Sequence, residues 1–279
     1  MKIHTCIWYN NTAQEAVKLY TEAFGDVKII SDSGMVVMFE VKGLPIMGLN
    51  GGDNFRPTPA FSYYVSFENE TEIEKAWNTL VKEGGKTLMP LDKYDWNPKY
   101  GWLEDKYGVS WQLWTGPFSK AEQKVVPGLM YCNKVQGKAD EAINLYTSLF
   151  PDSGRGMTAL YPEGTPDIAG QIVHAEFTLE NVLFKAFDSG IPHGFDFTEG
   201  MSVVVHCDSQ EEIDLYWDTL TKDGGQESQC GWCKDKFGVS WQIVPSILPQ
   251  LMSNPEKGQR VVQAFLKMKK FNIQALLDA

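Results

Sequence analysis

An internal duplication constrains the fold more than any other feature of the chain. The segment AQEAVKLYTEAFGD at 13–26 returns as ADEAINLYTSLFPD at 139–152, and GWLEDKYGVSWQLW at 101–114 returns as GWCKDKFGVSWQIV at 231–244. Repetition on this scale indicates that one folding module is used more than once. We therefore expect two homologous copies, at 1–119 and 125–247, followed by a C-terminal helical tail at 248–279.

Each copy carries two predicted amphipathic helices. They cover 13–26 and 70–85 in the first copy and 139–152 and 209–225 in the second. Apolar residues recur at helical spacing in each of them, so one face of each helix should pack on a core. The pairs Gly84-Gly85 and Gly224-Gly225 supply the left-handed backbone that commonly ends a helix.

Short β-like runs separate the helices. They are IHTCIWY, VVMFEV, LPIMGL, FSYYVSF and VSWQLW in the first copy, and GLMY, HAEFTL, VLFKAF, SVVVHC and VSWQIV in the second. Each copy thus contains a strand, a helix and further strands, twice over, which predicts an α+β fold with two βαβββ modules per copy. The longest unmatched stretches, 88–100 and 156–171, are rich in Gly, Pro and Asp, so we expect loops there that differ in ligand contacts.

The composition of the chain disfavours several classes of binding partner. The formal net charge of -11 and the sequence pI of about 4.9 disfavour nucleic acid and anionic lipid. The chain has no apolar run of membrane-spanning length and no signal-peptide pattern at its start, so we expect a cytoplasmic protein with no membrane partner. Five scattered cysteines argue for reduced thiols rather than a disulfide framework.

Two motifs carry a family resemblance. One is the Ala-x-Glu-Ala-x-x-x-Tyr helix, at 13–20 and 139–146, and the other is Asp-Lys-Tyr/Phe-Gly-Val-Ser-Trp-Gln, at 105–112 and 235–242. With the C-terminal segment 253–279, they make the chain resemble the vicinal oxygen chelate superfamily, which includes glyoxalase and bleomycin-resistance proteins, and within it the PhnB-like group. The resemblance covers nearly the whole chain.

The resemblance implies a specific architecture. Two βαβββ modules curl an eight-stranded mixed sheet around a cup, with helices outside, in each copy. Family members often form dimers, and the tandem fusion suggests either a monomer with an intrachain pseudo-dimer or a homodimer. The group is often labelled demethylubiquinone methyltransferase, but this sequence lacks the Gly-rich loop after a first strand and the downstream acidic residue that a Rossmann-like methyl-donor site usually needs.

The resemblance also points to a divalent cation held in the cup by His and Glu on the first and last strands of the two modules. The Glu position aligns with Gln112 and Gln242, whose neutral amides cannot supply the charge of a carboxylate. On the first strand, His4 is the one candidate in the first copy, and Pro127 and Gly128 stand in the second. We therefore expect no conventional metal site and no cofactor.

The candidate ligand-binding residues follow from strand alternation and aromatic content. Because side chains alternate along a strand, Trp111 and Trp241 should face the helices while Gln112 and Gln242 face the cup. Polar groups in apolar cups commonly orient a ligand, although a buried amide can equally bond to its neighbours. The set that we predict to contact ligand comprises Gln112, Gln242, His4, Trp8, Tyr64 and Trp114.

The remaining features favour structural interpretations. Cys230 and Cys233 form a Cys-x-x-Cys pair, but no second pair exists to complete a zinc site, and the first copy has Tyr100 and Leu103 at the matching places. His174 has a weaker claim than His4 to a metal or catalytic role. The tail helix after Asn254 should pack its apolar stripe on its own domain rather than on a partner subunit.

Three functions stay open on the sequence. The leading hypothesis is a protein that binds a small hydrophobic or oxygen-rich ligand in its cups without a conventional metal. The first alternative is a metal-dependent lyase, isomerase, dioxygenase or thiol-transferase using His4. The second is a non-catalytic interaction scaffold whose cups are filled by side chains.

Overall fold

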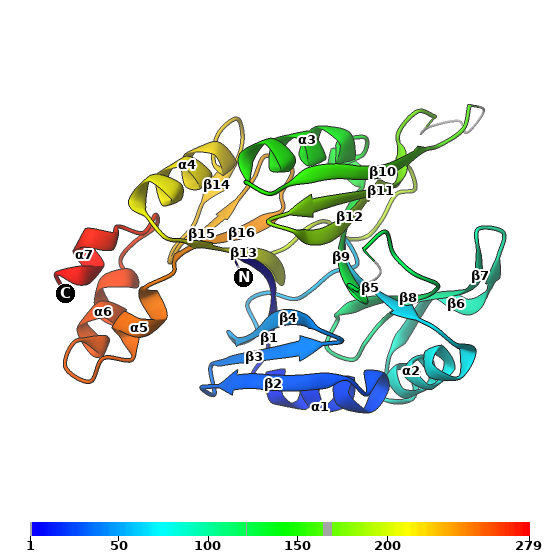
Figure 1. Ribbon diagram of the computed structural model, residues 1–279, viewed down its shortest axis with the longest axis horizontal. Helices are drawn as coiled ribbons and strands as arrows, with labels where there is room; N and C mark the ends of the chain where they lie inside the picture. The colour runs from blue at the N-terminus through cyan, green and yellow to red at the C-terminus, as the bar shows by residue number, and fades with distance from the viewer. Residues whose placement is uncertain (1, 121, 164–168) are drawn as a thin grey trace. The chain divides into compact units, whose positions relative to one another are not determined.

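The computed structural model describes residues 2–120, 122–163 and 169–279, which form four βαβββ modules and a short helical tail (Figure 1). The first two modules are β1 (Ile3–Tyr9), α1 (Ala13–Phe24), β2 (Val27–Asp32), β3 (Val36–Val41) and β4 (Leu44–Asn50), then β5 (Phe61–Phe67), α2 (Glu70–Lys82), β6 (Lys86–Tyr94), β7 (Asn97–Glu104) and β8 (Ser110–Thr115).

The third and fourth modules repeat this order. They are β9 (Val125–Tyr131), α3 (Ala139–Leu149), β10 (Gly154–Leu160), β11 (Ile172–Leu179) and β12 (Val182–Asp188), then β13 (Met201–Cys207), α4 (Gln210–Leu220), β14 (Gln226–Glu227), β15 (Trp232–Lys234) and β16 (Ser240–Pro245). A 3-10 turn, η1 (Asn133–Val135), precedes α3. The α+β class, the four helices and the strands expected from the repeat are confirmed.

The strands form two eight-stranded mixed sheets. Sheet A has the order β14-β15-β16-β13-β1-β4-β3-β2, and sheet B has the order β10-β11-β12-β9-β5-β8-β7-β6. Each sheet combines two modules, as expected, but the modules do not come from the same copy. Sheet B joins the second half of the first copy to the first half of the second copy, through antiparallel pairing of β5 with β9 that sets Ser62 opposite Gly128.

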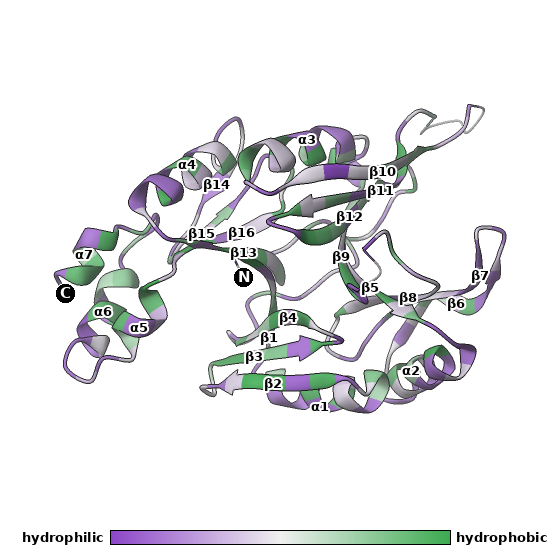
Figure 2. Cartoon of the chain, viewed as in Figure 1, coloured by the Kyte–Doolittle hydropathy of each residue, from purple (hydrophilic) through white to green (hydrophobic). Residues whose placement is uncertain are grey.

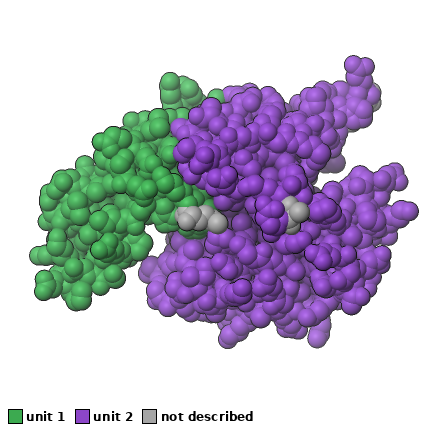
Figure 3. Space-filling model, viewed as in Figure 1, with its two compact units in different colours: residues 1–4, 202–279 green, residues 5–201 purple. Residues whose placement is uncertain are grey.

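The chain divides into two compact units (Figure 3). Unit 1 contains residues 1–4 and 202–279, and unit 2 contains residues 5–201. Within unit 1, the amide of His206 on β13 donates to the carbonyl of Lys2 at 2.8 Å. All of sheet B, together with α2 and α3, lies in unit 2. The predicted boundaries at 119 and 125 therefore fall inside unit 2, between two strands of one sheet.

The helices form where the sequence predicts because each has a polar and an apolar face, and Figure 2 shows hydrophilic and hydrophobic residues alternating along α1 and α2. The side chains of Asn69 and Ser209 begin α2 and α4 by accepting from the amides of Glu72 and Glu212. On α2 the buried face consists of Ile73, Ala76 and Leu80. This face covers one side of sheet B and leaves the other side for the cup.

The terminal motif of each copy is a buried turn centred on an aspartate. Oδ1 of Asp105 accepts from the amides of Tyr107 and Val109, and its Oδ2 accepts from Tyr20 Oη at 2.8 Å and Trp111 Nε1 at 2.9 Å. Burial raises the pKa of Asp105 to about 6, against the effect of these hydrogen bonds. The repeated Asp-Lys-x-Gly-Val-Ser-Trp sequence is thus a structural motif that orients the last strand.

Of the two stretches predicted as loops, 88–100 is largely strand, whereas 156–171 only begins in a strand. Residues 88–100 lie mainly in the β6–β7 hairpin, and the beginning of 156–171 belongs to β10; positions 164–168 lie outside the described residues. Both β6 and β10 are edge strands with irregular register against their neighbours. Edge strands tolerate Gly, Pro and charged residues because one side of the backbone needs no ladder partner, and this produces a loop-like sequence.

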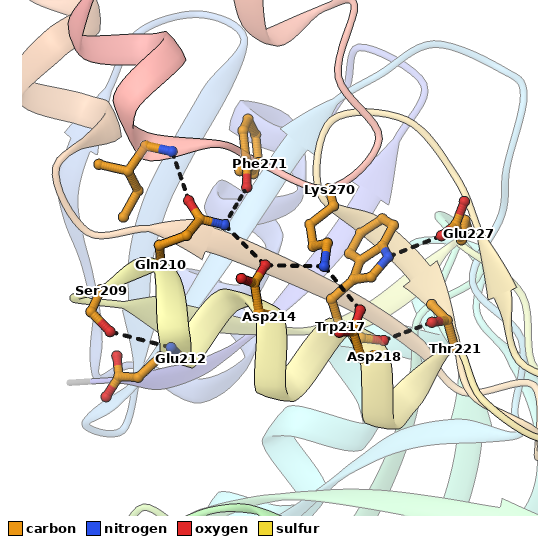
Figure 4. Close-up of polar contacts among 11 residues, drawn as sticks. Ser209, Gln210, Glu212, Asp214, Trp217, Asp218, Thr221, Glu227, Lys270 and Phe271 are labelled. Atoms are coloured by element: carbon orange, nitrogen blue, oxygen red, sulfur yellow. Dashed lines mark hydrogen bonds and ion pairs between the residues drawn. The ribbon is translucent and has the colours of Figure 1, made fainter.

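The tail comprises α5 (Leu248–Met252), α6 (Gly258–Phe265) and α7 (Ile273–Leu277), and it packs within unit 1. Gln210 on α4 donates to the carbonyl of Phe271 and accepts from the amide of Ile273, while Lys270 pairs with Asp214 and Asp218 (Figure 4). The tail therefore contacts the second copy within unit 1 through residues 270–273.

Candidate functional site in the sheet B cup

The cup is the face of sheet B opposite α2 and α3. On the helix side, a Cβ at Gly101 would approach the Trp77 ring of α2 within 2.6 Å, and Trp111 packs on Tyr20 and Phe24 with ring centroids 4.9 and 4.8 Å apart. Neighbours in sequence point the other way, so Tyr100, Trp102 and Gln112 face the cup. We refer to this concave face, with its side chains, as the sheet B cup.

Aromatic and apolar side chains fill most of the cup. Partly buried hydrophobic side chains surround a buried cluster, and together these residues are Tyr64, Tyr100, Phe118, Val126, Leu183, Met89, Tyr94, Trp102, Trp114 and Phe187. Gly128 makes room for this packing, because a Cβ at that position would lie 2.6 Å from Cε2 of Tyr64. The glycine on β9 therefore lets the Tyr64 ring pack directly against the backbone of that strand.

Lys185 lies at the centre of these rings. It is 1% exposed, and its Nζ is 4.5 Å from the ring centroid of Tyr64, 4.7 Å from that of Trp114 and 4.3 Å from that of Phe118. Ring faces attract a cation, so this enclosure partly replaces lost hydration. Burial still dominates and lowers the pKa of Lys185 to about 8, although the nearby charge of Glu176 acts in the opposite direction.

Glu176 is the counter-ion of this lysine and lies directly opposite it on the neighbouring strand β11. Its Oε1 is 3.9 Å from Lys185 Nζ and 3.9 Å from His174 Nε2. Within the described part of the chain, Glu176 Oε2 has no hydrogen-bond partner although it is buried. Burial favours a raised pKa for Glu176, but the neighbouring His174 and Ser119 and the charge of Lys185 outweigh it and lower the pKa.

Gln112 is held by neighbours on both sides of its amide. It accepts a hydrogen bond from Tyr100 Oη through Oε1 and donates to Ser62 Oγ through Nε2 at 2.8 Å. On the next strand, Trp102 Nε1 donates to Ser110 Oγ at 2.7 Å. These bonds fix the polar floor of the cup, and they leave Lys185 and Glu176 as its principal charged groups.

The predicted site residues separate into three places. Tyr64, Gln112 and Trp114 come together in the sheet B cup. His4 and Gln242 lie in unit 1, where Gln242 Nε2 donates to Ser202 Oγ at 2.9 Å and the His4 ring stacks on His206 with centroids 5.1 Å apart. His4 Nε2 is buried without a hydrogen-bond partner among the described residues, and burial lowers the pKa of His4 to about 3.

Trp8 lies outside the cup and lines a cavity of unit 2 with a volume of about 710 Å³. Its Nε1 donates to the carbonyl of Gly52, and the cavity walls also include Tyr9, Phe55, Arg56, Lys86, Glu104, Lys106 and Tyr107. Lys86 is paired with Glu104 at 3.6 Å and Lys106 with Glu83 at 3.5 Å, and both lysines are exposed. These solvated charges do not converge on one point, unlike the pair in the cup.

The four strands that would carry the family's metal ligands in sheet B are β5, β8, β9 and β12. Their cup-facing positions hold Ser62, Gln112, Gly128 and Lys185. An ammonium group and neutral side chains do not fit a divalent cation. Across residues 2–120, 122–163 and 169–279, no three His, Cys, Asp or Glu side chains are grouped as a metal site would require.

The pair Cys230 and Cys233 does not have the features of a redox or metal site. Cys230 and Cys233 are not joined in a disulfide, and burial raises the pKa of both thiols. A raised pKa lowers the thiolate fraction, which is the reactive form. Cys230 also anchors the tail, because its amide donates to the carbonyl of Met268 at 2.8 Å.

Comparison with known families decides the relationship. The profile of the 3-demethylubiquinone-9 3-methyltransferase family matches the chain twice, over residues 1–114 and 123–244. The chain belongs to this family. The two matches are the PhnB-like copies expected from the repeat, and the family name by itself assigns no reaction to this PhnB-like protein.

A solved glyoxalase structure shares the fold of this chain. Glyoxalase I from Zea mays is 12% identical, with 87% of this chain and 91% of that chain covered and a TM-score of 0.56. The PhnB protein from Bacillus cereus is 36% identical and covers 42% of this chain and 100% of its own, with a TM-score of 0.39. A comparison with curated proteins gives no significant match.

No helix in the described part of the chain combines the length and apolarity of a membrane span.

Lys185 and Glu176 were missed from the sequence. Matching the copies strand by strand would have revealed them, because Met38 pairs with Met47 in the first module where Glu176 pairs with Lys185 in the third. A lysine in the apolar run VLFKAF, at a position that holds methionine in the other copy, is the signal.

Proposed function

We propose that the sheet B cup binds a small, flat, uncharged molecule that carries a carbonyl oxygen next to a hydroxyl group. The observation that carries this proposal is the buried Lys185–Glu176 pair among aromatic rings, in which Glu176 Oε2 has no hydrogen-bond partner among the described residues. A buried polar atom without a partner costs roughly 1–3 kcal/mol, which a ligand could recover.

The chemistry of the two groups defines the ligand. Lys185 donates hydrogen bonds and accepts none, whereas ionised Glu176 only accepts. A ligand carbonyl would accept from Lys185 Nζ, and a hydroxyl beside it would donate to Glu176 Oε2. Because the two side chains already balance in charge, an uncharged ligand leaves the buried site neutral, and the rings of Tyr64 and Trp114 favour a planar body.

Salicylamide has this arrangement and serves as the test ligand, with benzamide as the matched compound that lacks the hydroxyl. Calorimetric titration should show salicylamide binding to the intact chain and weaker binding of benzamide. Lys185→Met should weaken salicylamide binding by roughly 10- to 100-fold, the range for a hydrogen bond to a charged group. Trp8→Leu, which alters the cavity lined by Trp8 outside the cup, should leave the affinity unchanged.

Two results would contradict the proposal. If neither compound binds, the rings and the ion pair only fill the cup, as in the scaffold alternative. If salicylamide binds but Trp8→Leu rather than Lys185→Met removes the binding, the ligand site is the Trp8 cavity. The metal-dependent alternative through His4 requires stoichiometric metal in the purified protein that is lost in His4→Ala.

A further inference from the structure

In the proposed ligand site the carbonyl group of the ligand would lie against the Lys185 amine, so this amine could do more than donate a hydrogen bond. We infer that the sheet B cup captures aldehydes covalently, as a reversible imine between Lys185 Nζ and the carbonyl carbon of the ligand. This inference rests on the proposed ligand site and extends it from binding to a bond-forming reaction.

The first requirement is a neutral amine, since only the free base attacks a carbonyl carbon. The aromatic walls formed by Tyr64, Trp114 and Phe118 exclude water from the ammonium and so favour the neutral form. With the pKa of Lys185 lowered to about 8, its neutral fraction at pH 8 is on the order of 100-fold larger than that of an exposed lysine.

The second requirement is a route for protons. Glu176 Oε1 lies 3.9 Å from Lys185 Nζ on one side and 3.9 Å from His174 Nε2 on the other. The side chain of His174 is 21% exposed, so the series leads from the buried amine to solvent. Neither 3.9 Å contact is a hydrogen bond, so the proton passes when the Glu176 carboxylate moves closer to each neighbour or when a water bridges the gap.

The reaction balances with these groups alone. The lone pair of neutral Nζ forms the N–C bond while the carbonyl π pair moves to oxygen, and the nitrogen proton passes through Glu176 to that oxygen to give a carbinolamine. Glu176, reprotonated from solvent, delivers a second proton that lets the hydroxyl leave as water while the nitrogen lone pair forms the C=N bond of an iminium. Glu176 then takes up the remaining nitrogen proton, which leaves the neutral imine and balances the proton taken from solvent. Amine and aldehyde thus become imine and water without an oxidant or reductant.

The geometry favours Lys185 over the other lysines of the chain. Lys2, Lys99 and Lys270 are paired with carboxylates, and their pKa values are raised. The equivalent position on β4 is Met47, so the first module has no amine there. We expect capture at one residue rather than general modification of the surface.

Salicylaldehyde is the probe, since it has the shape of salicylamide with an electrophilic carbonyl. The intact protein is incubated with salicylaldehyde at pH 8, the imine is reduced with cyanoborohydride, and the modified lysines are located by peptide mass spectrometry. Lys185 should be labelled at least ~10-fold faster than the exposed Lys28, and an excess of salicylamide should suppress this labelling.

Substitutions at Lys185 and Glu176 distinguish a loss of imine formation from a loss of the folded structure. Lys185→Arg keeps the buried cation but cannot form an imine, so it should abolish labelling in the cup. Glu176→Gln should slow the labelling of Lys185 and leave the labelling of Lys28 unchanged. In the protein without substitutions, the rate of Lys185 labelling should rise with pH through about 8.

The outcomes distinguish the two claims. Binding of salicylamide without preferential labelling of Lys185 would overturn the imine while leaving the proposed ligand site intact. Labelling spread evenly over exposed lysines would also overturn it. Absence of salicylamide binding together with absence of Lys185 labelling would overturn both claims.

Discussion

The buried pair makes a sharp prediction about stability. Lys185 and Glu176 have side chains 1% and 3% exposed, 3.9 Å apart, and at this distance the attraction is about 4 kcal/mol for an effective dielectric constant near 20. Replacing one partner by methionine leaves an uncompensated buried charge, which costs roughly 3–5 kcal/mol. We expect this loss of unfolding free energy for Lys185→Met and for Glu176→Met separately.

The double variant Lys185→Met with Glu176→Met should be much more stable than either single variant, within about 1 kcal/mol of the unmodified protein. The structure supplies the precedent, because Met38 pairs with Met47 at the matching positions of the first module. Replacing both charged groups removes the desolvation cost of both ions and keeps an apolar pair of similar volume.

The assay is urea unfolding at pH 7, monitored by the fluorescence of the tryptophans packed in the cup, for the four members of the cycle. The exposed pair Lys28–Asp26, 4.0 Å apart, gives the matched control, whose coupling should be below ~0.5 kcal/mol. Single-variant losses that simply add in the double variant would refute the reasoning, because they would mean that the two groups do not compensate each other.

Three further predictions concern other parts of the fold. Asp105→Asn should cost roughly 2–4 kcal/mol in urea unfolding, because an amide nitrogen would replace an acceptor that now serves two donors; a loss below 1 kcal/mol would contradict the structural role of the motif. Burial lowers the pKa of His4 from 6.5 to about 3, so the unfolded chain binds more protons than the folded chain between these pH values, and stability should be lost as the pH falls from 6.5 toward 3. In an acid titration of stability, His4→Phe should show a decline shallower by up to about 1.4 kcal/mol per pH unit. Identical slopes for the two proteins would count against this prediction. Gly231→Ala should loosen the tail, since its Cβ would lie 2.4 Å from the Phe271 ring at a φ of +79°; faster hydrogen exchange in 253–279 checks this, and unchanged exchange would refute it.

Much of the fold could be predicted from the sequence because the signals were local and repeated. The helices at 13–26 and 139–152 and the strand that carries Gln112 follow from periodicity, and the α+β class follows from their order. The orientation of Trp111 toward the helices and of Gln112 toward the cup followed from alternation along one strand.

The pairing of modules could not be predicted in the same way. The linkers 51–60, 116–124 and 189–200 are similar in length, so chain connectivity does not decide which modules share a sheet. The edge strands β6 and β10 were taken for loops because their sequences have weak alternation and many turn residues.

The most informative residues of the cup were missed for a related reason. Lys185 and Glu176 are far from the shared motifs, and each is unremarkable until strand register places them opposite one another. The predicted residues His4, Gln242 and Trp8 lie outside the sheet B cup, because a sequence pattern gives the face of a strand but not the sheet that it joins.

A crystal structure of the protein with salicylamide is the most direct test of the central claim. We predict the ring of the compound among Tyr64, Trp114 and Phe118, its carbonyl oxygen within hydrogen-bond distance of Lys185 Nζ, and its hydroxyl at Glu176 Oε2. Density for the compound in the Trp8 cavity, or an unchanged cup at saturating concentration, would contradict the account.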